Sequence, residues 1–266
     1  MLIRDQKREK HSPRFIGAGF QKCGSSSLHQ FLVRNVPWFC NPRYSDKELH
    51  AVPSKREAFP ADHREYLKKL GPTVPGFREP LDFTPNYAHR LSTLANIHKM
   101  FPGVKLFLTV RDPVERFYSA LDHGKQVGVI SAEMSDRKAF SLAQQSNQPW
   151  VGGLLEHGLY VPAIRASYQL FGPENVFVAS LSKLTSPSQG ASEIHRLAEF
   201  VGWHGLAVGK KTFPHVNESG NRSRPQPMIP RTARSEDVVA ALRDFYKPWQ
   251  EELASLVGAQ PVTEAL

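Results

Sequence analysis

A glycine-framed loop near the N-terminus combines residue types that bind phosphate. The segment Gly19-Phe-Gln-Lys-Cys-Gly-Ser-Ser26 keeps the G-x-x-x-x-G spacing of a nucleotide-triphosphate loop and ends on hydroxyl residues. Ser25 stands where such a loop has its lysine, and the lysine of this loop is Lys22. Backbone N–H groups at the start of a helix favour an anion, because the helix dipole is positive there. The sequence therefore predicts a phosphate site that differs from an ATP site.

Such a loop needs a strand before it and a helix after it. Apolar residues predict a short buried strand at Arg14–Ala18, and apolar side chains recur at helical spacing from Leu28 to Val36. Further apolar runs predict strands at Lys105–Val110 and Val176–Ser180. Strand, loop and helix thus follow one another in the order that a phosphate-binding loop requires.

Predicted helices lie between these strands and after the last of them. They are His63–Leu70, a helix within Arg111–Ala120, Val161–Phe171, Ala191–Val201, and Val239–Val257 with a break at Pro248. The rest of Pro37–Pro80, and Asp122–Pro149, are expected to be irregular. We predict an α/β, P-loop-like three-layer fold with a central parallel sheet flanked by helices. We expect a single domain over residues 1–266, with a flexible N-terminal segment at 1–13.

The composition indicates which kinds of ligand or partner the protein can have. A chain of 266 residues with 40% hydrophobic and 22% charged residues can bury an ample core. The formal net charge of +9 indicates an anionic ligand or partner. Because the basic residues are scattered along the chain, we predict no nucleic-acid partner, and a doubly phosphorylated nucleotide or an acidic glycan would fit the charge.

Cysteine and histidine usage indicates the compartment and argues against a metal. The two cysteines, Cys23 and Cys40, are too few for a disulfide framework, which favours a reducing compartment. Neither a signal-peptide run nor a membrane span is expected from the apolar segments. We predict a cytoplasmic protein, with the lumenal domain of a trimmed Golgi protein as the alternative. The eleven histidines form no H-E-x-x-H pattern, so no metal is predicted.

A second basic motif follows the predicted strand at Lys105–Val110. The segment Arg111-Asp-Pro-Val-Glu-Arg-Phe-Tyr-Ser119 runs from the strand end into a helix. The planar guanidinium of Arg111 matches phosphate oxygens, and Ser119 follows eight residues later, so both can reach the carboxyl edge of the sheet. The alternative is that Arg111 forms a surface ion pair with Asp112 or Glu115. Arg116 fits a structural ion pair as well as a ligand contact.

These segments together resemble the sulfotransferases that use 3′-phosphoadenosine 5′-phosphosulfate (PAPS), and most closely the heparan sulfate branch. Gln21–Ser27 resembles the 5′-phosphosulfate loop, Arg111–Ser119 the 3′-phosphate segment, and Gly158-Leu-Tyr160 the start of a helix. The resemblance spans Phe15–Val257. It implies transfer of a sulfuryl group from PAPS to a hydroxyl or amine, which leaves 3′-phosphoadenosine 5′-phosphate (PAP). A carbohydrate acceptor is expected first, and a lipid or a small molecule is the alternative.

The resemblance also implies roles for single residues. Lys22 would stabilise the leaving phosphate, and Glu48 in Lys47-Glu-Leu-His50 would be the general base, with His50 assisting it. His29 and His123 are rival bases. The implied cofactor-binding residues are Gln21, Lys22, Cys23, Gly24, Ser25, Ser26, Ser27, Arg111, Ser119, Asn217, Ser219, Gly220 and Arg222.

One segment departs from the family pattern. Asp82-Phe-Thr-Pro-Asn-Tyr87 resembles a family segment Glu-Lys-Thr-Pro-x-Tyr whose lysine approaches the sulfuryl group, and Phe83 occupies that position. Either Lys22 acts alone, or Arg78 or Lys47 substitutes, or the alignment is locally displaced. Two other classes stay open, a P-loop kinase-like enzyme and a non-catalytic binder of an anionic ligand. The missing Gly-Lys-Ser/Thr argues against the kinase.

Overall fold

The computed structural model describes residues 12–43, 45, 47–71, 78–145, 149–203, 213–214 and 229–258. The chain divides into two compact units, of which the first comprises Met1–Val110 and Ala163–Glu218 and the second Arg111–Pro162 and Ser219–Leu266. The first unit holds the sheet, and the described residues of the second are mainly helical. The organisation as one domain stays a prediction.

The sheet of the first unit is parallel, as predicted. Its strands β1 (Phe15–Gly19), β4 (Lys105–Val110) and β5 (Val176–Ser180) lie in the order β1-β4-β5. Two short strands, β2 (Phe39–Cys40) and β3 (Glu79–Pro80), form a separate parallel pair. The β4 and β5 strands begin and end at the predicted residues, and β1 is displaced by one residue from the prediction.

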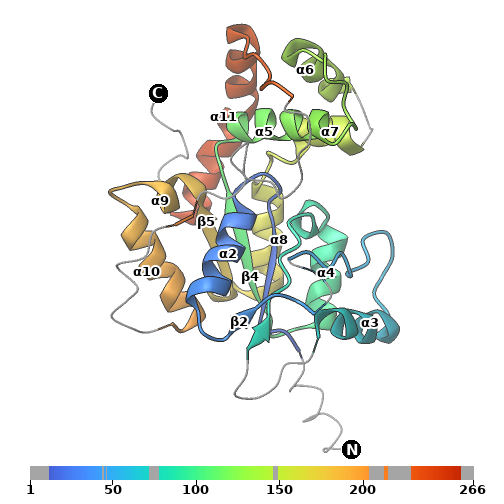
Figure 1. Cartoon of the computed structure of the whole chain (residues 1–266), viewed down its shortest axis with the longest axis vertical. Coiled ribbons are helices and arrows are strands. Elements are labelled where there is room, and N and C mark those ends of the chain that lie inside the picture. Colours follow the sequence, from blue (N-terminus) through green and yellow to red (C-terminus); the bar gives the residue numbers. More distant parts are fainter. Residues whose placement is uncertain are drawn as a thin grey trace, which may run out of the picture. The chain divides into compact units, whose positions relative to one another are not determined.

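Helices surround this sheet (Figure 1). They are α2 (Ser25–Asn35), α3 (Pro60–Leu70), η1 (Tyr87–His89), α4 (Leu91–Met100), α8 (Val161–Phe171), η2 (Pro173–Asn175), α9 (Leu181–Thr185) and α10 (Gly190–Val201). The α8 helix enters the first unit at Ala163. The prediction of an α/β fold with a central parallel sheet flanked by helices is confirmed.

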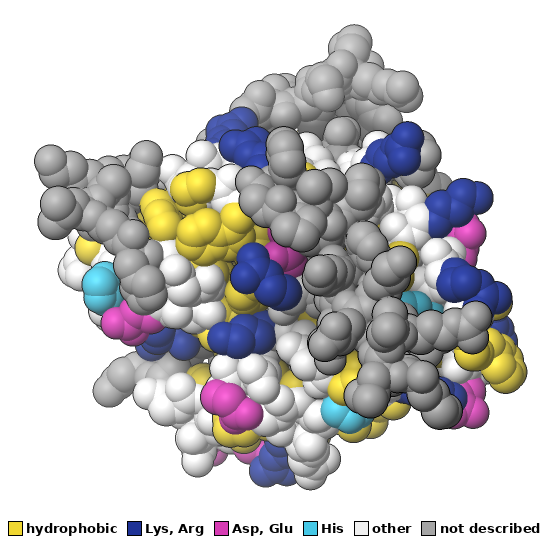
Figure 2. Space-filling view, turned by 90° about the horizontal axis from the view of Figure 1, so that it is seen from below, with side chains coloured by type: hydrophobic (Ala, Val, Ile, Leu, Met, Phe, Trp, Pro, Cys, Tyr) yellow, Lys and Arg dark blue, Asp and Glu magenta, His cyan; other side chains and the backbone are white. Residues whose placement is uncertain are grey.

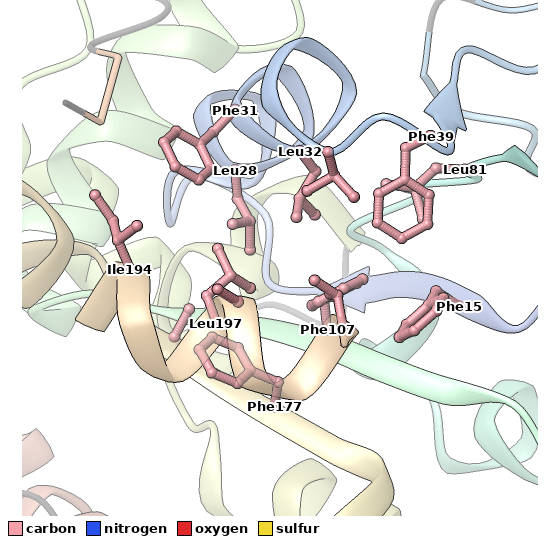
Figure 3. Packing of buried hydrophobic residues seen from close by; sticks show 14 of the residues in the cluster. Phe15, Leu28, Phe31, Leu32, Phe39, Leu81, Phe107, Phe177, Ile194 and Leu197 are labelled. Atoms are coloured by element: carbon pink, nitrogen blue, oxygen red, sulfur yellow. The ribbon is translucent and has the colours of Figure 1, made fainter. Parts of the chain in front are cut away.

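The core of the first unit fixes α2 on the sheet. Figure 3 shows Leu28 and Phe31 of α2 pointing toward the sheet, where Phe107 and Phe177 lie, and Leu197 of α10 packed into the same cluster. Each of these five side chains is at most 2% exposed. Because full burial of one large apolar side chain contributes roughly 1.5–3 kcal/mol, α2 is held firmly and its N-terminus has a fixed position.

The opposite face of the sheet is covered as well. Successive side chains of a strand point to opposite faces, so Leu106 and Leu108 lie on the face opposite Phe107. Both leucines are fully buried. A strand that is buried on both faces is typical of a parallel sheet between helical layers.

The described part of the second unit consists of helices α5 (Pro113–Gln126), α6 (Asp136–Gln145), α7 (Pro149–Glu156) and α11 (Glu236–Val257). The prediction that 122–149 is irregular was wrong, because most of it belongs to α5 and α6. Ala139 and Ala143 follow each other at helical spacing and bury one face of α6. Asp136 starts α6, and its carboxylate accepts bonds from the Tyr118 hydroxyl and from Ser235, the N-cap residue of α11. Contacts from residues distant in sequence hold the start of this helix, and the local sequence pattern does not show them.

The predicted break at Pro248 is also absent, since α11 continues through this residue. Proline removes one backbone hydrogen bond from a helix interior and favours a kink. Val238, Leu242 and Tyr246 precede it on one buried face, and Leu253 follows it on the same helix. Burial of this face outweighs the single lost hydrogen bond.

Candidate functional site

The predicted phosphate loop is the connection between β1 and α2. Its chain turns at Phe20–Gly24, and both Lys22 (φ 67°) and Gly24 (φ 84°) have left-handed backbone conformations. Glycine adopts this conformation without strain, whereas a lysine does so at a cost. A non-glycine residue in this region is a feature that recurs at ligand sites.

The start of α2 is open to an anion. Gly24 is the N-cap residue and has no side chain to accept bonds from the first N–H groups of the helix. A Cβ atom at this position would lie 2.6 Å from Cδ1 of Leu181, so the loop has no space for a capping side chain. The helix N-terminus and its dipole can therefore act on a bound phosphate.

A second lysine lies against the loop. The Lys47 ammonium donates to Ser25 Oγ at 3.1 Å, to Ser26 Oγ at 3.0 Å and to Glu48 Oε1 at 2.9 Å. Its side chain is only 14% exposed. Burial lowers the pKa of Lys47, and the neighbouring Glu48 opposes this shift. The contacts join the segment of the predicted base to the phosphate loop.

Glu48 and His50, the predicted catalytic pair, lie together. Oε2 of Glu48 is 3.0 Å from Nε2 of His50, and Oε1 receives the bond from Lys47. Side-chain exposure is 33% for Glu48 and 57% for His50. A carboxylate held between two nitrogen groups and open to solvent can accept a proton from a substrate.

A buried carboxylate holds the backbone of this segment. Oδ1 of Asp82 accepts from the Leu49 N–H at 3.2 Å and from the Thr84 hydroxyl at 2.7 Å. Its Oδ2 accepts from the hydroxyls of Tyr66 and Tyr87, each at 3.0 Å. Burial raises the pKa of Asp82 to about 6, and these hydrogen bonds oppose the shift. Asp82 thus fixes the residue next to Glu48 from 33 positions away.

The hydroxyls around Asp82 extend this support along the chain. Thr84 Oγ1 accepts from the N–H groups of Leu49 at 3.0 Å and His50 at 3.3 Å, and Tyr87 OH accepts from Ala51 at 3.0 Å. Three consecutive N–H groups are therefore held by one buried network. The sequence analysis did not predict this role for Thr84 or Tyr87, although the Thr-Pro-x-Tyr pattern could have indicated it.

Phe83 belongs to the core. Its ring is fully buried, lies parallel to that of Phe107 with centroids 5.9 Å apart, and covers Gly17, whose added Cβ would lie 2.1 Å from Phe83 Cγ. The Phe83 N–H donates to the Lys47 carbonyl at 2.9 Å. The residue at the expected lysine position is therefore a backbone neighbour of Lys47, and of the two proposed substitutes Lys47 is the one in contact with the loop.

The rival base His29 has an unfavourable environment. Its side chain is 4% exposed, and burial, followed by the charge of Lys47, lowers its pKa to about 4. Such an imidazole is a weak base near neutral pH. The other rival, His123, lies on α5 in the second unit.

The predicted 3′-phosphate residues lie in the second unit. Arg111 precedes α5, is 26% exposed and donates to Glu115 at 3.2 Å, which is the ion pair considered as the alternative to phosphate binding. Glu115 also binds Arg234, and the Asp112 carboxylate accepts from the Glu115 N–H at 2.9 Å. Ser119 lies one turn further along α5 and is partly exposed. Arg111 is therefore held at the start of a helix by a neighbouring carboxylate.

Arg116 has a structural role in the second unit. It is 1% exposed and donates to the carbonyls of Gly153 at 2.8 Å and Leu154 at 3.0 Å. The remaining predicted cofactor residues lie outside the described residues, namely Asn217, Ser219, Gly220 and Arg222.

The basic side chains are spread over the surface. In Figure 2, Lys and Arg side chains lie at separate places on the face shown. Among the described residues, no helix has the length and apolar character that crossing a membrane requires. The same part of the chain contains no group of three or more His, Cys, Asp or Glu side chains suited to a metal ion.

The fold and the loop define a P-loop-like α/β protein, and comparison with solved structures specifies its type. The crystal structure of a sulfotransferase from Alicyclobacillus acidocaldarius matches with a TM-score of 0.70 at 20% identity, over 94% of this chain and 97% of that one. A sulfotransferase from Mycobacterium avium matches with a TM-score of 0.55 at 13% identity, over 99% of this chain and 82% of that one. The chain therefore has the sulfotransferase fold.

Curated relatives extend the similarity to sequence. Heparan sulfate glucosamine 3-O-sulfotransferase 3B1 of Mus musculus is 25% identical over 268 residues, which cover 94% of this chain and 64% of that protein. The 3A1 protein of Homo sapiens is 24% identical, over 94% of this chain and 62% of its own length. The chain thus spans a little under two thirds of these relatives. No protein-family model matches the chain. The predicted resemblance to sulfotransferases of the heparan sulfate branch is confirmed.

Proposed function

We propose that this protein transfers a sulfuryl group from PAPS to a hydroxyl or amine group of a carbohydrate. The observation that carries the proposal is the contact of Lys47 with both the loop hydroxyls and Glu48, which joins a phosphate loop to a solvent-accessible base. The sulfotransferase fold and the names of the curated relatives favour this activity over a kinase-like enzyme or a non-catalytic binder.

The residues of the loop fit the phosphosulfate end of the donor. An open helix N-terminus and two lysines provide N–H donors and positive charge for an anion. By resemblance, the loop residues Gln21–Ser27 take this end, and Arg111 and Ser119 take the 3′-phosphate. Asn217, Ser219, Gly220 and Arg222 would complete the site around the nucleotide.

PAPS supplies an activated sulfuryl group, whose transfer leaves negative charge on the 5′-phosphate of PAP. Lys22 and the N–H groups of the loop would stabilise that charge. Glu48 would accept the proton of the acceptor group while His50 holds the other carboxylate oxygen at 3.0 Å. The buried network of Asp82 holds the backbone that follows this base.

Charge and relatives support an acidic glycan as the acceptor. The names of the curated relatives specify heparan sulfate glucosamine, and the net charge of +9 favours a polyanionic partner. A lipid or a small molecule stays the alternative acceptor. The cytoplasmic location likewise stays a prediction.

The base assignment is tested with Glu48→Gln. Glutamine keeps the shape of the side chain but cannot take a proton, so transfer of label from radiolabelled PAPS to heparan sulfate should fall by about 10²- to 10⁴-fold. PAP affinity should change little, which calorimetry measures. Glu57→Gln is the matched control, because Glu57 is 70% exposed and pairs with Lys99 on the surface. Wild-type rates in Glu48→Gln, with the control equally active, would exclude Glu48 as the base.

A further inference from the structure

The position of Lys47 bears on the absent family lysine. Phe83, which stands at that lysine's position, fills the core over Gly17 and cannot present a charge. Its N–H binds the Lys47 carbonyl at 2.9 Å, so the two residues lie side by side on neighbouring segments. The structure therefore offers a lysine beside the position that has lost one.

The Lys47 side chain extends to the phosphate loop. Its ammonium lies at 3.1 Å from Ser25 Oγ and 3.0 Å from Ser26 Oγ, on the first turn of α2. A cation beside the open N-terminus of a helix places two favourable fields on the same anion.

From this geometry we propose that Lys47 is a second catalytic cation, which contacts the 5′-phosphosulfate of the donor and replaces the lysine absent at Phe83. The inference rests on the proposed sulfuryl transfer. In that reaction the acceptor oxygen or nitrogen forms a bond to sulfur, and the bond from sulfur to the bridging phosphate oxygen breaks. The electron pair stays on the 5′-phosphate, and the acceptor proton passes to Glu48. Lys47 keeps its proton and stabilises the charge that grows on the phosphate.

Charge favours an exchange in which the Lys47 ammonium leaves the hydroxyls of Ser25 and Ser26 and binds the phosphate oxygens of PAPS. Bonds from an ammonium to neutral hydroxyls are weaker than bonds to phosphate oxygens, in which both partners carry charge. Three donors on Nζ allow Lys47 to keep Glu48 as a partner while it binds the donor. Its low exposure limits screening by water and salt. The alternative is a purely structural role, in which Lys47 only ties Glu48 to the loop.

Two ligands that differ in the 5′-phosphate distinguish a catalytic role of Lys47 from a purely structural one. PAP carries the 5′-phosphate, and adenosine 3′-monophosphate lacks it. In Lys47→Met, calorimetry should show PAP affinity reduced by about 10- to 100-fold, with the affinity for adenosine 3′-monophosphate unchanged. Lys47→Arg should keep most of the preference for PAP. Lys55→Met, which removes an exposed lysine of the same unit, is the matched control.

The rate at saturating PAPS gives a second readout. Lys47→Met should lower label transfer to heparan sulfate by about 10²-fold at saturation, because the lost charge acts chiefly in the transition state. Binding of adenosine 3′-monophosphate reports that the variant is folded.

Each result has a distinct meaning. If Lys47→Met keeps the wild-type preference for PAP, or loses affinity for both ligands equally, the inference is overturned and the proposed function stands. If wild-type protein itself shows no preference for PAP, the proposed function fails and the inference fails with it. A selective loss for PAP with a reduced saturating rate supports both.

Discussion

At the scale of single residues, two carboxylates of the first unit have opposite surroundings and therefore different roles. The Glu48 side chain is 33% exposed, so a substrate can reach its carboxylate. Nζ of Lys47 contacts its Oε1, and Nε2 of His50 contacts its Oε2. Asp82 is fully buried among hydroxyls and N–H groups, so it can only hold its neighbours. Glu48 therefore stays the predicted base, and Asp82 holds the backbone beside it.

The raised pKa of Asp82 gives stability a characteristic dependence on pH. Folding raises this pKa from 3.8 to about 6, so between these values the folded state holds a proton that the unfolded state releases. The contribution of Asp82 to the free energy of unfolding should therefore fall as pH rises from about 4 to 6, by about 3 kcal/mol in total. Other carboxyl groups titrate in both proteins, so urea unfolding across this range should show wild type losing about 3 kcal/mol relative to Asp82→Asn. Equal slopes in the two proteins would contradict the buried titration of Asp82.

At the scale of elements, the turn between β1 and α2 depends on Gly24. Its left-handed backbone reverses the chain at the helix start, and Leu181 of α9 lies against it. Any side chain here meets two obstacles, the positive φ and the contact with Leu181. The core under α2 fixes the position of this turn. The turn thereby determines the direction of the N–H groups of the loop.

Gly24→Ala should therefore reduce both stability and ligand binding. The φ strain costs about 1–2 kcal/mol and the contact with Leu181 adds about 1–3 kcal/mol, which urea unfolding measures. PAP affinity should fall by calorimetry, because the loop is displaced. The matched control is Gly202→Ala, at φ 73° with open space around its added Cβ, which should show the φ cost alone and normal binding. Equal effects of the two variants would show that the contact with Leu181 has no importance.

The elements also show what the sequence could predict. Strands at Lys105–Val110 and Val176–Ser180 and the helix Val161–Phe171 were predicted with their bounds, because apolar periodicity is local. The α6 helix and the passage of α11 through Pro248 were missed, since contacts distant in sequence stabilise them. The same holds for the candidate site: the motif spacing predicted Glu48 and His50, which lie together, whereas the Asp82 network joins segments 33 residues apart and was not predicted.

At the scale of the whole molecule, the net charge and the similarity to known proteins both support the proposed sulfuryl transfer. A net charge of +9 favours anionic ligands, and 94% of the chain aligns with proteins named as heparan sulfate sulfotransferases. The chain carries the predicted 5′-phosphosulfate loop in its first unit and the predicted 3′-phosphate arginine in its second. The proposed function requires that the protein bind PAP in preference to other adenine nucleotides.

Calorimetric titration of the purified protein with PAP, beside ATP and 5′-AMP, measures this preference. We expect micromolar binding of PAP, much weaker binding of ATP and 5′-AMP, and a loss of roughly 10- to 100-fold for PAP in Arg111→Ala, because a charged contact to the 3′-phosphate is removed. Arg64→Ala, which removes an exposed arginine of α3, should bind PAP as wild type does. Equal affinity for PAP and 5′-AMP would exclude recognition of the 3′-phosphate, and an Arg111→Ala variant that binds PAP normally would exclude Arg111 from it.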